Sequence, residues 1–174
     1  MIKRLLGSVT ALAVLTIAAV IPTAASQSPV ERAVIPVTWE LTSEQCPHLP
    51  DGTTVWGEGT LTDTVIAKEK DGVTSLHIVS QASGSAYDNH GNVYHFHYGD
   101  INEQQNSVAS PNLFIGTMVD QFSLAGNGPA NLTNGFKGTT SFDANTNAFL
   151  ITSVQWMHGD PVTTPVVNSI CDPL

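Results

Sequence analysis

Basic residues are scarce in this chain, which has six Lys and Arg against fifteen Asp and Glu and a formal net charge of −9. Proteins that bind DNA or RNA use Lys and Arg to neutralise phosphates, and anionic lipid headgroups attract the same positive charges. The sequence therefore predicts no nucleic-acid partner and no membrane partner for the mature protein. The simplest role of the excess acid is to keep the protein soluble.

Long apolar segments are also few. The one sustained run covers residues 9–21, comes after two basic residues and is followed by a proline and small residues. It is shorter than the roughly 20 residues that cross a bilayer, and its three-part layout is typical of a secretory signal peptide. We predict a signal peptide over residues 1–26, with cleavage near Ser26-Gln27, and one secreted, extracellular domain over residues 27–174. Removal of the leader leaves four basic residues against fifteen acidic ones, a formal net charge of −11.

Only two cysteines are present, Cys46 and Cys171, and both belong to the predicted mature domain. Secreted proteins meet an oxidising environment, in which an even number of cysteines favours pairing. We predict a structural Cys46–Cys171 disulfide. Because it closes a loop of more than a hundred residues, chain-entropy reasoning gives it about 4 to 5 kcal/mol of stabilisation.

No long segment has the 3.6-residue apolar period of an amphipathic helix. Thr, Val and aromatic residues instead alternate with polar ones between Gly, Pro, Asn and Asp turns, a pattern typical of β-strands. Residues 101–110 lack this alternation and are predicted to form a loop or one short helix. The eight predicted strands cover residues 34–42, 54–66, 73–81, 83–88, 93–98, 112–124, 132–142 and 148–157. This succession favours an all-β fold, a small antiparallel barrel of about eight strands, with a β-sandwich as the alternative.

The most distinctive motif is Tyr94-His95-Phe96-His97-Tyr98, in which aromatic residues and histidines alternate. Residues two apart on a strand share a face, so the aromatic rings point to one side and the imidazoles to the other. A four-residue turn, Asn89 to Asn92, would place both histidines on the face of the preceding strand that carries small residues. The candidate ligand-binding residues on that face are His95, His97, Ala82, Gly84 and Ala86.

This grouping leaves two interpretations open. If the histidine face lines the interior, the small residues beside the imidazoles leave space for a ligand. If the aromatic face is the core, as the burial preference of aromatic rings favours, His95 and His97 are solvated residues of the outer surface.

Metal binding and catalysis are two further hypotheses for the same residues. His95 and His97 have the spacing of two ligands of a divalent metal, although a site needs a third or fourth ligand. Further ligands would have to come from His77, His90, Asp88, Asp100, Glu103 or His158. The chain has no nucleophile elbow, phosphate loop or dinucleotide-binding motif. The sequence therefore predicts a secreted acidic β-domain that binds a small ligand or serves a structural or interaction role, and the alternative is an isomerase or hydrolase that uses His95 and His97.

Overall fold

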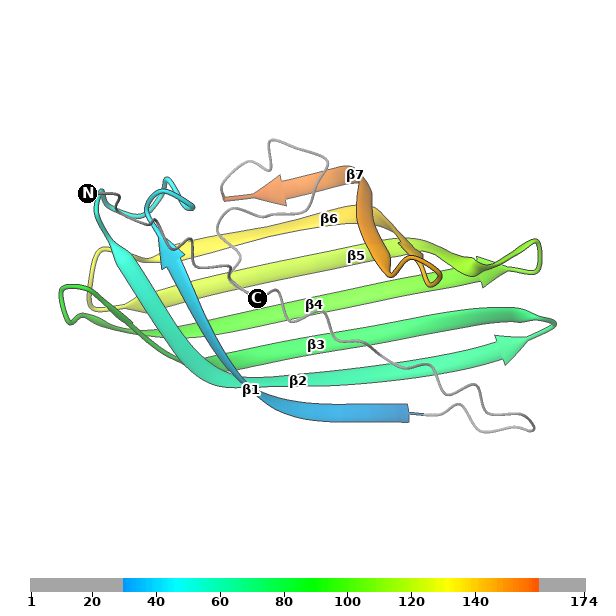
Figure 1. Cartoon of the computed structure of the whole chain (residues 1–174). Helices are drawn as coiled ribbons and strands as arrows, with labels where there is room; N and C mark the ends of the chain where they lie inside the picture. Colours follow the sequence, from blue (N-terminus) through cyan, green and yellow to red (C-terminus); the bar gives the residue numbers. More distant parts are fainter. Residues whose placement is uncertain (1–29, 160–174) are drawn as a thin grey trace, which may run out of the picture.

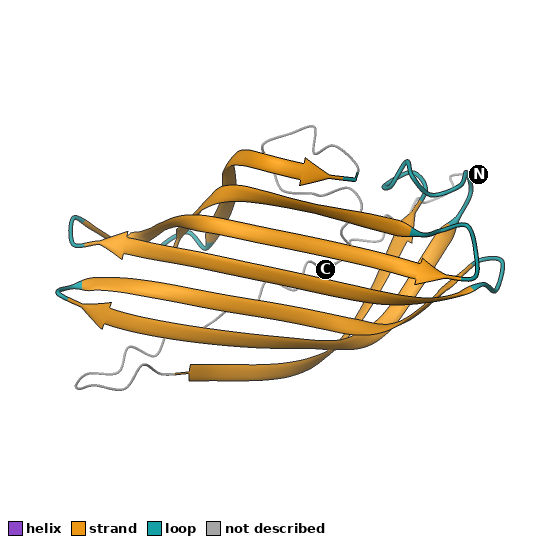
Figure 2. Ribbon diagram, turned by 180° about the vertical axis from the view of Figure 1, so that it is seen from behind, coloured by secondary structure: helices purple, strands orange, loops and turns teal. Residues whose placement is uncertain are grey.

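The computed structural model describes residues 30–159, and these residues form one antiparallel β-sheet without a helix (Figures 1 and 2). Val, Ile, Thr and aromatic residues, which fit a pleated and half-buried surface, recur along all of its strands. The strands are β1 Val30–Thr42, β2 Thr54–Lys70, β3 Val73–Asp88, β4 Val93–Ser107, β5 Ser110–Gly126, β6 Leu132–Asp143 and β7 Ala148–His158.

Each strand pairs only with its neighbours in the chain, so β1 and β7 form the two edges of the described sheet. Figure 1 shows β1 and β2 bending strongly, so that one end of each rises from the plane of the other strands. The bend gives the sheet a concave face and an outer face. The all-β antiparallel prediction is confirmed, but the sheet formed by residues 30–159 is not closed into a barrel.

The register assigns every strand residue to one of these two faces. The concave face carries the even-numbered residues of β3 to β6 and the odd-numbered residues of β1 and β2, and the outer face carries the alternate positions. Tyr94 and Phe96 are therefore concave residues, fully buried, as expected for aromatic side chains.

Residues 30–159 form seven strands where the sequence predicted eight, because residues 73–81 and 83–88 belong to one strand, β3. The loop or helix predicted over residues 101–110 is also wrong, since β4 continues to Ser107. In this part of β4 the buried concave positions are the polar residues Asn102, Gln104 and Asn106, while Ile101 is exposed. Apart from Ile101, the outer positions of this segment are polar as well, so the strand has no apolar face that an alternation pattern could find.

The hydrophobic core occupies one end of the concave face, which we call the apolar end. Trp39 of β1 packs edge-on against Phe96 and Phe122, with ring centroids 5.2 and 5.7 Å away. A Cβ at Gly57 would collide with the Trp39 indole, so a glycine is required where this ring crosses β2. Edge-to-face pairs of this kind add to the stabilisation that comes from burial alone.

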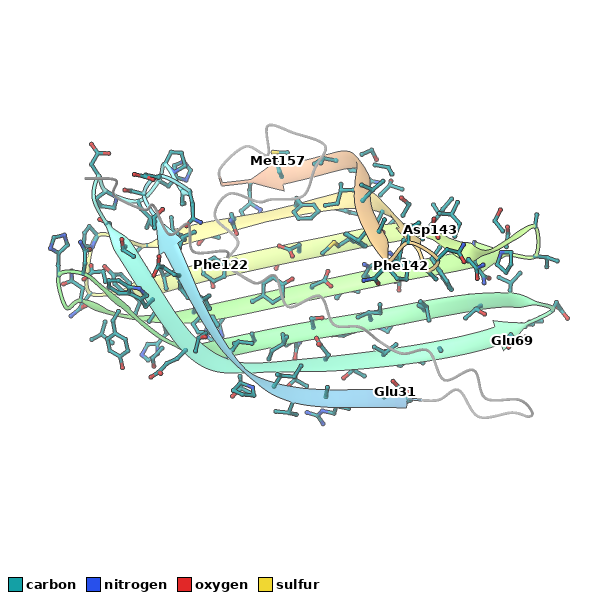
Figure 3. All side chains as sticks on the ribbon, in the orientation of Figure 1. Glu31, Glu69, Phe122, Phe142, Asp143 and Met157 are labelled. Atoms are coloured by element: carbon teal, nitrogen blue, oxygen red, sulfur yellow. The ribbon has the colours of Figure 1, made fainter. Side chains whose placement is uncertain are left out.

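Polar side chains occupy the other end of the concave face, which we call the polar end. Gln104 Nε2 donates to Thr140 Oγ1 at 3.1 Å, and Asn106 Nδ2 donates to the Pro111 carbonyl at 2.7 Å. These bonds satisfy groups that would otherwise be costly to bury. Figure 3 shows Phe122 and Phe142 towards the two opposite ends of the sheet.

Cys46 lies in the connection after β1 and is fully buried with Leu49 and Ala130 in the core. Its predicted partner, Cys171, and the predicted signal peptide over residues 1–26 lie outside the described residues. The disulfide and the leader therefore stay predictions.

Candidate functional site

His95 and His97 lie on the outer face of β4, where both side chains are exposed. Their cross-strand partners on β3 are Ser85 and Ser83, so each imidazole stands beside a small hydroxyl side chain. Neither imidazole has a hydrogen bond or ion pair within the part of the chain that the structure describes. Of the two interpretations of this motif, the structure matches the one in which the aromatic rings form the core.

The predicted grouping of the histidines with Ala82, Gly84 and Ala86 on one face is wrong. Gly84 is the cross-strand partner of Phe96, so the three small residues share the concave face with the aromatic rings. The cause is the parity of the turn. Asp88 and Asn92 are already paired, since the Asp88 amide donates to the Asn92 carbonyl at 3.2 Å, and the loop between them has three residues and not four.

The small concave residues have a structural role. Gly84 and Gly59 are cross-strand partners, and a Cβ on either glycine would collide with the opposite backbone and with the Phe96 ring. Ala82 and Ala86 are buried at 5% and 0% exposure. Their small size lets the aromatic side chains of the core pack directly against the backbone of the sheet.

Asp88 fixes the three-residue loop and thereby the register that places the histidines outside. Its Oδ1 accepts hydrogen bonds from the amides of His90 and Asn92, both at 2.9 Å. Its Oδ2 accepts from Asn92 Nδ2 at 2.7 Å and from the Tyr94 hydroxyl at 2.9 Å. Burial opposes ionisation, but the hydrogen bonds from Asn92, Tyr94 and His90 outweigh it and lower the pKa of Asp88 to about 2.

A hollow of about 430 Å³ opens beside His97. This volume lies in the range of roughly 300 to 1,000 Å³ found for small-molecule pockets, but the hollow is widely open to solvent and not an enclosed cavity. Gly99, the next outer-face residue of β4, has nothing within 4 Å of the place where a Cβ would stand, which is one reason why the sheet is bare here. The hollow is lined by Thr60, Thr62, Gln81, Ala82, Ser83, His97 and Tyr98.

The lining of the hollow is largely polar and contains no Asp, Glu, Lys or Arg side chain. Ala82 and Tyr98 have their side chains on the concave face, whereas the other five lining residues have theirs on the outer face. These five supply hydroxyl, amide and imidazole groups that donate and accept hydrogen bonds. Of the predicted ligand-binding residues, the structure brings His97 and Ala82 to the hollow, places His95 one outer-face position away and leaves Gly84 and Ala86 in the core.

The structure does not support a metal site at His95 and His97. Within residues 30–159, no group of three or more His, Cys, Asp or Glu side chains is arranged to hold a metal ion. His77 pairs with Glu103 at 3.3 Å, two cross-strand rows beyond Gly99. Asp88 and Asp100 are concave residues, and His90 lies in the loop after β3.

Sequence reasoning missed a row of carboxylates on the concave face. Asp63, Asp100 and Asp120 lie in one cross-strand row, with Ser80 between the first two. Burial, followed by the charges of Asp120 and Asp63, raises the pKa of Asp100 to about 8. The Tyr98 hydroxyl donates to Asp120 Oδ2 at 2.9 Å. A row that crosses four paired strands becomes visible only when the register is known.

Within residues 30–159 there is no helix with the length and apolar character needed to cross a bilayer. Comparison of the chain with protein-family models, curated proteins and solved structures found no match.

Proposed function

We propose that this chain is a secreted binding protein that takes a small polar molecule into the hollow beside His97. The observation that carries the proposal is the hollow itself, whose 430 Å³ are lined by hydroxyl, amide and imidazole groups on a rigid sheet. Sites built on strands hold their side chains more firmly than sites on loops. A pre-formed site of this kind binds without a large ordering cost.

We infer an uncharged ligand from the same lining. Thr60, Gln81 and Ser83 offer neutral donors and acceptors, and the chain as a whole has a net charge of −9 that repels anions. His97 adds an imidazole, whose two ring nitrogens are further hydrogen-bonding groups. A molecule with several hydroxyl or amide groups matches these partners best.

The proposal includes the expected setting of the site. The signal peptide over residues 1–26 would export the protein to an oxidising environment. There the two cysteines of the chain would pair as Cys46–Cys171. Closure of the sheet into a barrel is supported by the meander order of the seven described strands and by the strong bend of β1 and β2.

The alternative function is an enzyme, an isomerase or hydrolase on the same sheet. His95 and His97 are exposed and without partners among the described residues, so the observation that favours acid–base chemistry is the concave carboxylate row. There Asp100 has a pKa of about 8, and a carboxyl group whose pKa lies near the working pH is suited to general acid–base catalysis. An enzyme of this kind would lose its activity in Asp100→Asn and keep it in His97→Ala.

Thermal melting against a panel of small polyols, amides and sugars tests the binding function, since a ligand of the native state raises the melting temperature. Gly99→Phe places a ring over the hollow without a backbone clash, because no atom lies within 4 Å of its Cβ position. We expect this variant to lose the shift that a ligand gives to the native protein. Ser75→Phe is the matched control, since Ser75 is an exposed residue of the outer face far along β3. If no compound shifts the native protein, or if both variants respond as it does, the proposal is wrong.

A further inference from the structure

Two large, exposed aromatic residues are cross-strand partners on the outer face, beyond the hollow. Trp56 of β2 and Tyr87 of β3 are direct cross-strand partners and are 44% and 45% exposed. Most of the other aromatic residues in the described chain are buried or half-buried. Tyr and Trp combine a large apolar surface with a polar group, which makes them frequent at binding surfaces. We call this pair the aromatic platform.

The platform is held in position before any ligand arrives. Trp56 Nε1 donates to Glu40 Oε2 at 2.7 Å, and Glu40 is the cross-strand partner of Trp56 on β1. The indole is thereby tied towards β1, while Tyr87 stands on the opposite side of β2. Because a fixed ring loses little conformational freedom on binding, it contributes more of its contact energy to affinity.

A polar strip joins the platform to the hollow. Tyr87 and Ser83 are four residues apart on β3, which corresponds to about 13 Å along a strand. Two cross-strand rows of outer-face residues fill this distance, and both consist of polar side chains. The rows are Glu58, Ser85 and His95, then Thr60, Ser83 and His97.

We propose that the outer face binds a neutral oligosaccharide, with one sugar ring on the Trp56 and Tyr87 platform and the chain running along the polar strip into the hollow. This inference rests on the proposed function and names its ligand class. A sugar ring has an apolar face of C–H groups that packs on an aromatic ring, and a rim of hydroxyls that donate and accept hydrogen bonds. The platform offers the first kind of surface, and the strip offers the second.

The charges of this region select a neutral saccharide. Glu40 and Glu58 flank Trp56 on the outer face, and no Lys or Arg lies in the rows between the platform and the hollow. Carboxylates accept hydrogen bonds from sugar hydroxyls but repel sulfate, phosphate and uronate groups. A cationic peptide is the competing ligand, since a positive charge can also lie on an indole ring between carboxylates.

Titration of the mature protein with neutral glucose, mannose and N-acetylglucosamine oligomers of increasing length tests the inference. We expect at least one series to bind, with longer oligomers binding more tightly than the monosaccharide. Trp56→Ala should weaken the longest oligomer about tenfold, as expected for the loss of a stacking contact worth about 1.4 kcal/mol. Trp56→Phe should retain more of the affinity, because it keeps a ring. Melting curves of both variants establish that the fold is intact.

The outcomes separate this inference from the proposed function. Oligomer binding that is weakened by both Trp56→Ala and Gly99→Phe supports both proposals. A ligand that is sensitive to Gly99→Phe but not to Trp56→Ala keeps the hollow as a binding site and overturns the oligosaccharide. Failure of all three series to bind, or binding of a lysine-rich peptide through Trp56 in their place, also overturns it.

Discussion

Two aspartates of the concave face both have little exposed surface, and they have opposite protonation behaviour. Asp88 at the apolar end is 4% exposed and Asp100 at the polar end is 7% exposed. Asp88 accepts four hydrogen bonds from one loop and from Tyr94, and its pKa is lowered to about 2. Asp100 has an oxygen that is buried without a hydrogen-bond partner, and its pKa is raised to about 8.

The difference has two causes: four hydrogen bonds keep Asp88 ionised, whereas burial, followed by the charges of Asp120 and Asp63, favours the protonated form of Asp100. At the apolar end, aromatic rings form the core, and the one carboxylate there, Asp88, has four hydrogen bonds. The packing of the rings should therefore supply most of the stability of this end. The polar end places Asp100 beside Asp120 and in the row of Asp63, which costs stability whenever all three are ionised. The apolar end should thus dominate folding, and the polar end should control its pH dependence.

The largest expected loss of stability comes from removing a core ring at the apolar end. Phe96→Ala should lower the free energy of unfolding by about 3 to 5 kcal/mol, because Phe96 is fully buried and packs on Trp39 and Phe122. Phe114→Ala is the matched change at the polar end, where the ring is half-buried and its one neighbouring ring, Phe142, is tilted at 6.4 Å. Urea unfolding measures both. An equal loss in the two variants would contradict the division of the concave face into two ends.

The next effect is a change in pH dependence caused by Asp100. Its folded pKa of about 8 lies above its ordinary value of 3.8, so the folded state holds a proton that the unfolded state has lost. The free energy of unfolding should therefore fall as the pH rises from 4 to 8, by up to about 1.4 kcal/mol per pH unit. Asp100→Asn should remove this slope and be more stable than the native protein at pH 7 and above.

Urea titrations between pH 5 and pH 8 measure this slope. Asp51→Asn is the control, because Asp51 is exposed in the connection between β1 and β2. It should leave the pH dependence as in the native protein. A slope that survives in Asp100→Asn would assign the pH dependence to another group.

The strands were predictable from the sequence wherever a strand had one apolar face. The alternation around Trp39 and the turn at Asp71-Gly72, whose positive φ angles of 55° and 76° suit a two-residue hairpin, identified most of β1 to β3. The second half of β4 was missed because its buried positions carry Asn102 and Gln104. Hydrophobic periodicity cannot identify a strand whose inner side chains are stabilised by hydrogen bonds instead of by apolar burial.

The candidate site depended on a quantity that local sequence leaves undetermined, the parity of one loop. Asn89 to Asn92 is compatible with a loop of three or of four residues. The loop length decides whether His95 and His97 share a face with the serines of β3 or with its alanines and Gly84. The hollow and the aromatic platform each depend on the register of β2 with β3. The exposure of Trp56 and Tyr87 and the pairing of their strands were not predicted from the sequence, and only the structure brings the two residues together.

The smallest effect, and the one that tests the saturated carboxylate directly, is expected for Asp88→Asn. An asparagine amide puts a donor where Asn92 Nδ2 or the Tyr94 hydroxyl needs an acceptor, which should cost about 1 to 3 kcal/mol at pH 7. Because the folded pKa of Asp88 is lowered, its stabilisation is present above about pH 4 and is lost as the pH falls towards 2. The native protein and the variant should therefore converge in stability over that acidic range.

Asp143→Asn is the control, since Asp143 accepts one backbone hydrogen bond in the turn before β7, from Asn145 at 2.8 Å, and should lose less. A constant difference between Asp88→Asn and the native protein from pH 7 to pH 2 would mean that the loop is held by shape and not by the charge of Asp88.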